Sequence, residues 1–236
     1  MVDVSCNKIM AAIPLRAGSK GLPNKNLLPL DGKPLYRHAV DQALRVVGQC
    51  VITTDITELH KAEMPKGCLV VQRPQALAQD TTPMTPVLSH LFSELEQKNS
   101  LPQTVVLLQA TSPLRSDRDV EKAIALYEKG NDELVMSVTE ADAGVLKYGF
   151  LNDGKFTAVS RPEYCFYNRQ NLPDLVRPNG AVYVFSPQVF RKNGGLSTNS
   201  IGAVEMPQSR SIDIDSAADM NLAEVMFAES ASRLAG

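Results

Sequence analysis

The residues best suited to chemistry form a basic, glycine-containing segment near the N-terminus. Arg16, Lys20 and Lys25 lie in the segment RAGSKGLPNKN, which follows an apolar run that we expect to be the first strand. Backbone N–H groups of a glycine turn can form a concave anion site, and neighbouring cations add positive charge. The three cations together would neutralise much of a triphosphate. On composition alone, a solvated basic turn remains an open alternative.

The spacing of the glycines excludes two familiar phosphate loops. Neither G-x-x-x-x-G-K-[ST] nor G-x-G-x-x-G occurs in the segment. Pro23 also prevents a helix from continuing directly out of the turn. An anion site here would therefore be of a different kind.

A pair of acids near the C-terminus forms the second group. Asp213 and Asp215 lie two residues apart in the alternating segment SIDIDSAAD. In a strand, such residues point to the same face, and two aligned carboxylates suit Mg²⁺. The alternative is that Asp215 or Ser216 caps the last helix, which leaves Asp213 unexplained.

Further polar side chains follow apolar runs that we expect to be strands. Gln109 ends the run TVVLLQ, and its carboxamide suits sugar hydroxyls. Arg73 lies just past another such run. Arg169 and Arg177 flank a proline-containing segment, and arginine is well suited to a carboxylate. The alternative for these two arginines is an ordinary place on the surface.

The order of the expected elements predicts how these groups are positioned. Strand and helix patterns alternate to about residue 140, which predicts a mostly parallel sheet covered on both faces. We expect a helix over 35–47, a helix capped by Thr85 with Pro86 at its first position, and a capping box from Ser116 to Asp119. Ligands of such sheets bind beyond the carboxyl ends of the strands.

Residues 141–180 break this alternation. This irregular segment is rich in aromatic side chains, namely Tyr148, Phe150, Phe156, Tyr164, Phe166 and Tyr167. Such a segment is either a satellite cluster of the same core or a contact surface for another subunit.

Composition narrows the class of protein. The chain has 236 residues, of which 44% are hydrophobic and 21% charged, and a net charge of −2, which argues against a general nucleic-acid surface. Its four cysteines lack metal-ligand spacing, and we interpret them as reduced thiols of a cytosolic protein. No run reaches the ~18 apolar residues that span a bilayer, and the N-terminus is not typical of a signal peptide.

The ordered set of motifs resembles a known family. The pattern R-x-x-S-K-G-x-P-x-K-N at 16–26 is followed by RPQALAQD, LLQATSPLR, RQNLPDLVRPNGAVYVF and SIDIDSAAD. Together they resemble CMP-sialic acid synthetases (N-acylneuraminate cytidylyltransferases) over nearly the whole chain. The resemblance implies one Rossmann-like three-layer α/β domain over 1–236, of the nucleotide-diphospho-sugar transferase type. It also implies a homodimer, with 141–180 as an inserted dimerisation element that reaches over the partner's active site.

The resemblance further implies transfer of CMP from CTP to a sialic acid, with release of pyrophosphate. Arg16 and Lys20 would stabilise the leaving pyrophosphate. The implied CTP contacts are Leu15, Arg16, Ser19, Lys20, Lys25, Asn26 and Arg73. The implied sugar contacts are Gln109, Arg169, Arg177, Tyr183 and Lys147, the last across the dimer. Asp213 and Asp215 would hold Mg²⁺.

Rival functions remain open on the sequence. One is a cytidylyltransferase for legionaminic, pseudaminic or 3-deoxy-octulosonic acid. Relatives specific for the first two often carry arginine after the Ser-Lys pair, so Gly21 favours sialic acid. The other is a non-catalytic nucleotide-binding protein, against which the intact basic loop and acid pair argue.

Overall fold

The computed structural model describes residues 8–234, so Cys6 lies outside the described part of the chain. The strands are β1 (Ile9–Pro14), β2 (Pro29–Leu30), β3 (Lys33–Pro34), β4 (Cys50–Thr54), β5 (Cys68–Gln72), β6 (Thr104–Leu108), β7 (Leu134–Ala141), β8 (Gly149–Asn152), β9 (Lys155–Ala158), β10 (Leu175–Phe185) and β11 (Ile201–Glu205). The α-helices are α1 (Leu35–Val46), α2 (Thr57–Lys61), α3 (Met84–Gln97), α4 (Asp117–Tyr127), α5 (Pro187–Asn193) and α6 (Ala217–Leu234). Short 3₁₀ turns are η1 (Lys25–Leu27), η2 (Gln75–Leu77), η3 (Ala143–Lys147), η4 (Pro162–Phe166), η5 (Arg169–Asn171) and η6 (Gln208–Arg210). None of the helices in this range has the length and apolar content that a bilayer crossing requires.

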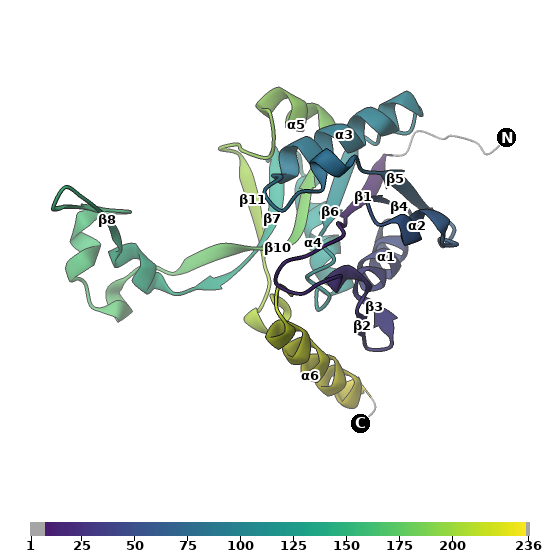
Figure 1. Ribbon diagram of the computed structural model, residues 1–236. Helices are drawn as coiled ribbons and strands as arrows, with labels where there is room; N and C mark the ends of the chain where they lie inside the picture. Colours follow the sequence, from purple (N-terminus) through teal and green to yellow (C-terminus); the bar gives the residue numbers. More distant parts are fainter. Residues whose placement is uncertain (1–7, 235–236) are drawn as a thin grey trace.

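A seven-stranded sheet in the order β11-β7-β10-β6-β1-β4-β5 forms the centre of the molecule (Figure 1). Its strands pair in parallel, apart from β10, which is antiparallel to both β6 and β7. The predicted mostly parallel sheet is therefore confirmed. The exception arises because β10 returns from an excursion of the chain instead of from a crossover helix.

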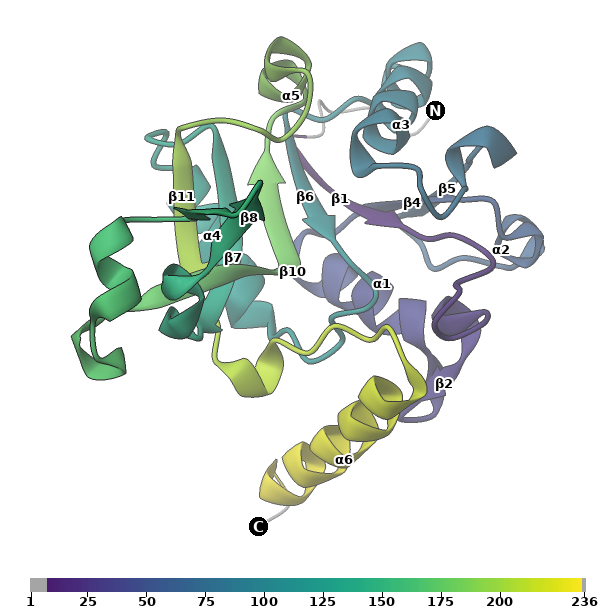
Figure 2. The same cartoon turned by 60° about the vertical axis from the view of Figure 1, so that its left-hand side comes forward.

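Helices cover both faces of the sheet, as Figures 1 and 2 show. The side chains of α1 and α4 pack with one face of the strands, and those of α3 and α5 pack with the other. A third, smaller cluster joins α6 to the β2–β3 hairpin through Leu30, Leu35, Ile214, Met220 and Ala223. This last cluster fixes the segment that carries the predicted acid pair.

The local predictions have mixed outcomes. Helix α1 and the capping box at Ser116 and Asp119 are confirmed. The predicted Thr85 cap is wrong, because α3 begins at Met84 after an extended Pro83. Pro86 is the third residue of α3 and is tolerated there, since the N–H groups of the first turn of a helix need no partner within it. Residues 211–216 are not a strand of the sheet, although the buried Ile214 lies between the exposed Asp213 and Asp215.

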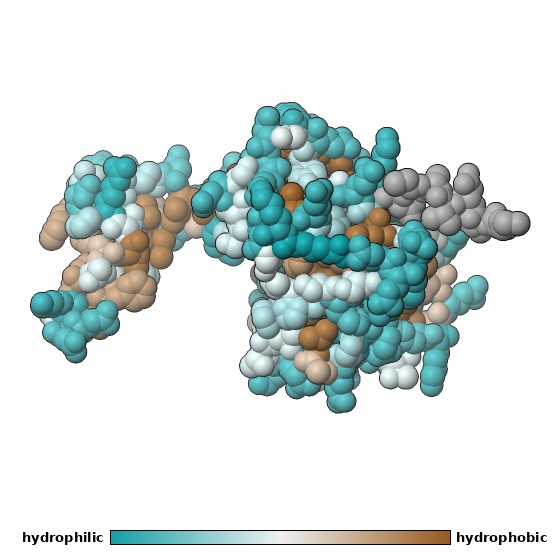
Figure 3. Space-filling model, turned by 90° about the horizontal axis from the view of Figure 1, so that it is seen from above, coloured by the Kyte–Doolittle hydropathy of each residue, from teal (hydrophilic) through white to brown (hydrophobic). Residues whose placement is uncertain are grey.

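Residues 141–180 project from the body as an arm (Figure 1). Its root is the paired ends of β7 and β10, and its outer part holds the β8–β9 hairpin and 3₁₀ turns. The exposed apolar side chains of the arm are Val145, Tyr148, Phe150, Leu151, Phe156, Val159, Phe166, Tyr167 and Val176. Seen from above in Figure 3, apolar side chains gather on this arm. Its aromatics are therefore not a satellite of the main core.

Candidate active site

A cleft opens at the carboxyl ends of the parallel strands β1, β5 and β6. It encloses about 180 Å³ and brings together Leu15, Arg16, Lys25, Asn26, Arg73, Asp80, Gln109 and Thr111. Three segments that are far apart in the sequence therefore meet here, at the edge where a parallel sheet places its ligands.

The basic segment after β1 has a fixed shape. Gly18 has a φ of 65°, a conformation that side chains disfavour, and the Ala17 amide donates to Asp55 Oδ1 at 2.9 Å. The buried Asn26 side chain donates from Nδ2 to the Arg16 carbonyl oxygen at 3.0 Å. This hydrogen bond joins the two ends of the segment. Ser19 is also buried. A freely solvated turn would show none of these contacts.

Each cation of the segment has an acidic partner in this chain. Arg16 Nη1 and Lys20 Nζ contact the two oxygens of Asp80, at 2.6 and 3.0 Å. Lys25 Nζ donates to Asp215 Oδ1 at 2.6 Å and to the Ile214 carbonyl oxygen at 2.9 Å. The positive charge is thus concentrated on the cleft and balanced by carboxylates that border it.

Arg73 differs from the other cations of the cleft because its side chain is buried. Its Nη2 donates to the Thr53 carbonyl oxygen at 2.7 Å, whereas its Nε has no hydrogen-bond partner among the described residues. Burial lowers the pKa of Arg73 to about 10, against which the charge of Asp55 acts. A buried guanidinium that forms no ion pair within the described chain favours an anionic ligand.

The acid pair lies beside this cleft. The Ile214 amide donates to the Thr111 carbonyl oxygen at 2.9 Å, and the Ile214 side chain is buried under α6. Asp213 and Asp215 flank it on the exposed side. Desolvation raises the pKa of Asp213, and repulsion from the Asp215 carboxylate adds to this rise. Two carboxylates that repel each other are a suitable donor set for a divalent cation.

The start of α6 shows whether Asp215 or Ser216 caps this helix. Ser216 Oγ accepts from the Asp219 amide at 3.3 Å, and Asp219 accepts from the Ser216 amide at 2.8 Å. These two residues form the cap, so neither Asp213 nor Asp215 is needed for it.

Gly21 lies against the backbone of the acidic segment. A Cβ at this position would lie 2.4 Å from the Asp215 carbonyl oxygen, a distance that requires one of the segments to shift. The basic and acidic segments therefore lie too close together at this point to leave room for a side chain. Gly21 consequently has a steric reason to be glycine, independent of any sugar.

Two of the predicted sugar contacts lie near the cleft. The Gln109 carboxamide lies beside Gly180, whose φ is 77°. Tyr183 is half-buried on β10, and burial together with the charge of Asp213 raises the pKa of its phenol. Gln109 thus lines the cleft, and Tyr183 lies close enough to Asp213 for that charge to act on its phenol.

The other three predicted sugar contacts do not join the cleft within this chain. Arg169 is in the arm and pairs with Asp142 at 2.9 Å, and Lys147 donates to the Tyr167 carbonyl oxygen. Arg177 lines a separate cavity at the root of the arm.

Sequence reasoning missed two residues of this region, Asp80 and Arg115. Each belongs to a segment that stood out in the sequence, RPQALAQD or LLQATSPLR, but neither was given a role. An aspartate seven residues after Arg73 was the available signal for the first. The partners of Arg115 are too distant in sequence to be foreseen.

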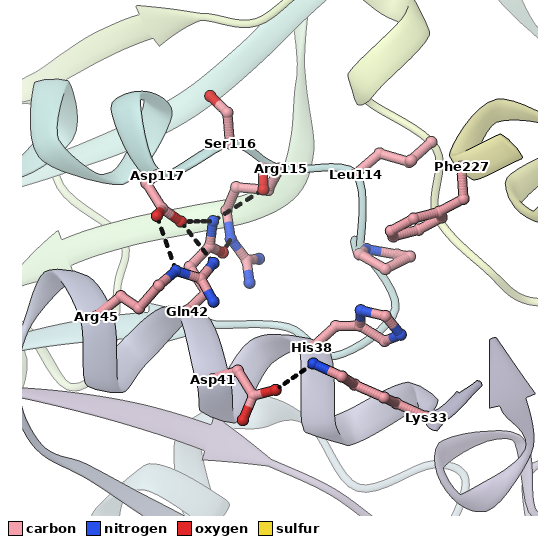
Figure 4. Close-up of a pocket in the computed structure, with 11 residues that line it drawn as sticks. Lys33, His38, Asp41, Gln42, Arg45, Leu114, Arg115, Ser116, Asp117 and Phe227 are labelled. Carbon is pink, nitrogen blue, oxygen red and sulfur yellow. Dashed lines mark hydrogen bonds and ion pairs between the residues drawn. The ribbon is translucent and has the colours of Figure 1, made fainter. Parts of the chain in front are cut away.

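Arg115 lines a second cavity, of about 300 Å³, between α1, α6 and the start of α4 (Figure 4). It is buried, which lowers its pKa to about 10. Its Nη1 donates to the carbonyl oxygens of Gln109 and Ala181, at 3.2 and 2.7 Å, and its Nε donates to Gln42 Oε1 at 2.7 Å. Arg115 therefore fixes β6, β10 and α1 to one another directly behind the cleft.

We predict that Arg115→Met lowers the free energy of unfolding by about 3 kcal/mol, because several buried acceptors lose their donor. Arg45→Met is the matched control. Arg45 pairs with Asp117 on the rim of the same cavity but is exposed, and we expect its loss to cost below about 1 kcal/mol. Urea denaturation of both variants measures the difference. Equal costs would contradict the role given to Arg115.

Comparison with known proteins places the chain in a family. Residues 10–193 match the family model described as cytidylyltransferase. N-acylneuraminate cytidylyltransferase of Streptococcus agalactiae serotype III is 30% identical over 90% of this chain and 51% of its own length. CMP-N,N'-diacetyllegionaminic acid synthase of Legionella pneumophila is 30% identical over 93% and 96%.

Among solved structures, CMP:2-keto-3-deoxy-manno-octonic acid synthetase complexed with CTP superimposes with a TM-score of 0.71. It is 19% identical, over 94% of this chain and 99% of that chain, so it shows the fold alone. The chain spans about half the length of the first curated relatives it matches. Because the family model covers most of the chain and the legionaminate relative matches almost end to end, the chain belongs to the cytidylyltransferase family.

Proposed function

We propose that this chain transfers CMP from CTP to the anomeric hydroxyl of an acidic nine-carbon sugar, with N-acylneuraminate as the first candidate. The observation that carries the proposal is the cleft itself. Cations from two segments, Arg16 and Lys25 with the buried Arg73, converge beside a pair of carboxylates. Membership of the family supports the same reaction class.

In this reaction the anomeric oxygen attacks the α-phosphorus of CTP, and the bond from that phosphorus to the bridging oxygen breaks. Pyrophosphate carries the electron pair away, and the hydroxyl proton passes to solvent. Such transfers depend on positioning and on charge neutralisation. Arg16 and Lys20 neutralise the departing pyrophosphate, while Lys25 and Arg73 hold the phosphates. Leu15, Ser19 and Asn26 bind the rest of the nucleotide.

The acid pair suggests Mg²⁺ as the cofactor. Asp213 and Asp215 would hold it, because both carboxylates lie beside the basic segment, and the charge of Asp215 adds to the rise in the pKa of Asp213. Bound there, Mg²⁺ supplies positive charge to phosphate oxygens. Lys25 forms an ion pair with Asp215, so this lysine connects the acid pair to the proposed phosphate site.

A homodimer would supply the remaining sugar contacts. The arm exposes a group of large apolar side chains and carries Arg169 and Lys147 away from its own cleft. Exposed apolar surface of this kind favours a protein partner. We propose that a second copy covers the arm, and that the arm contributes Arg169, Arg177 and Lys147 to the sugar side of the partner's cleft.

We also propose a cytoplasmic enzyme, since Cys50, Cys68 and Cys165 are free thiols.

The experiment that tests the function measures pyrophosphate release with CTP, Mg²⁺ and a panel of acidic sugars. The panel contains N-acetylneuraminate, N,N'-diacetyllegionaminate, pseudaminate and 3-deoxy-octulosonate. We expect the highest kcat/KM with N-acetylneuraminate. Release with another sugar alone would correct the substrate, and no release with any sugar would reject the enzyme.

We predict that Asp213→Asn lowers kcat by about 100-fold or more, because one of two proposed metal ligands is lost. Asp31→Asn is the control, since Asp31 is an exposed aspartate in the β2–β3 turn. Circular dichroism should be unchanged in both variants. Wild-type turnover of Asp213→Asn at limiting Mg²⁺ would rule out the metal role.

We predict that the wild-type chain sediments as a dimer at micromolar concentration. The double variant Leu151→Ser/Phe166→Ser should sediment as a monomer, because it removes two of the most exposed apolar side chains of the arm. Leu69→Ser, which alters an exposed leucine on β5, should leave the dimer intact. A monomeric wild-type chain would contradict the proposed role of the arm.

A further inference from the structure

Asp80 holds a position that a phosphate group would be expected to hold. Its Oδ1 lies 2.6 Å from Arg16 Nη1, and its Oδ2 lies 3.0 Å from Lys20 Nζ. A single carboxylate thus bridges the two cations that the proposed function assigns to the leaving pyrophosphate. Asp80 also lines the cleft, beside Arg73 and Gln109. Its two ion pairs are its only polar contacts found among the described residues.

The contacts of Arg16 and Lys20 suit an exchange of partners. Lys20 keeps 81% of its side chain exposed while it is paired, so it can turn to another anion without unpacking. Arg16 Nη1 also donates to the Gly18 carbonyl oxygen at 2.9 Å, which holds the guanidinium at the cleft whichever anion it faces. The Asp80 side chain is one-quarter exposed and the residue as a whole is exposed, so solvent reaches this carboxylate.

A purely structural carboxylate would be expected to have a different environment. Asp119 is such a case, because it is buried, its carboxylate accepts from the Ser116 amide in the capping box of α4, and it pairs with Arg210. Asp80 caps no helix and binds no backbone amide among the described residues. Its pKa is lowered mainly by the hydrogen bond from Lys20, so the carboxyl is ionised at neutral pH and competes with other anions.

We propose that Asp80 is a resident anion of the phosphate site. It pairs with Arg16 and Lys20 before CTP binds, releases them to the terminal phosphates of CTP, and pairs with them again as pyrophosphate leaves. Asp80 is a positioning residue in this scheme, because it acts through the two cations and touches no reacting atom. The inference rests on the proposed function for the identity of the ligand, a polyphosphate anion.

Every anion that enters the site must displace Asp80, and the free energy of this displacement weakens its binding. A polyphosphate must replace two existing ion pairs and approach a carboxylate of like charge. Its affinity is therefore lower than the cations alone would give, and pyrophosphate dissociates more easily after the transfer. An asparagine at this position removes both penalties.

Asp41 provides a matched control. It also bridges a lysine and an arginine, Lys33 at 2.9 Å and Arg37 at 2.7 Å, and its side-chain exposure of 22% is close to the 25% of Asp80. It lies on α1 at the cavity of Figure 4, away from the phosphate site. Asp41→Asn therefore makes the same chemical change without touching Arg16 or Lys20.

The experiment titrates wild-type protein, Asp80→Asn and Asp41→Asn with inorganic pyrophosphate by calorimetry. We expect Asp80→Asn to bind pyrophosphate about three- to tenfold more tightly than wild type, and Asp41→Asn to match wild type. Equal or weaker binding by Asp80→Asn would overturn the inference, as would the same gain in Asp41→Asn. Asp80→Ser, verified by circular dichroism, replaces Asp80→Asn if that variant does not fold.

Product inhibition gives a second readout that a merely structural role would not move. In the CTP assay, Asp80→Asn should be inhibited by pyrophosphate at a three- to tenfold lower concentration than wild type, in line with the calorimetry. An unchanged inhibition constant in an active enzyme rejects the inference and leaves the function standing. Absence of turnover with every sugar rejects the function, and the pyrophosphate titration then still decides the role of Asp80.

Discussion

The site depends on one contact between segments almost two hundred residues apart. Lys25 Nζ reaches Asp215 and the Ile214 carbonyl oxygen, while Gly21 lies against the same backbone. This contact exists because Ile214 is buried in the cluster that α6 forms with the β2–β3 hairpin. The packing of α6 therefore helps to hold the acid pair beside the basic segment.

Opposed charges in and beside this cleft explain how a chain with a net charge of only −2 can concentrate cations. Asp80 balances Arg16 and Lys20, and Asp215 balances Lys25. Each carboxylate limits the repulsion between the cations of the basic segment. The buried Arg73 is the exception, and its desolvated guanidinium gives the cleft a charge that its neighbours offset only in part.

Periodicity and turn chemistry were sufficient to predict the sheet, its helical layers and the capping box at Ser116, because these depend on local sequence. The same reasoning predicted that Arg16 and Gln109 would lie at one edge of the sheet, since polar groups that follow buried strands meet there. Sequence reasoning failed for features of the fold that depend on contacts between residues far apart in the chain. The antiparallel direction of β10 is set by the arm.

The finer features of the site were also beyond local reasoning. Gly21 has its steric role because the backbone of residue 215 folds against it, and Asp80 acquires its role only when two cations from another segment reach it. Arg115 likewise depends on Ala181 and Gln42, which belong to elements far along the chain. No pattern within a single window contains such partners.

Strand β10 runs without interruption from the root of the arm into the centre of the sheet. Its pairing with β7 shifts register between Pro178 and Tyr183, and within this irregular stretch Gly180 lies against Gln109 while Ala181 accepts from Arg115. A single strand thus connects the arm to the cleft, and the register shift lies between them. Whatever fixes the direction of the arm therefore also fixes the backbone that lies against Gln109 at the edge of the cleft.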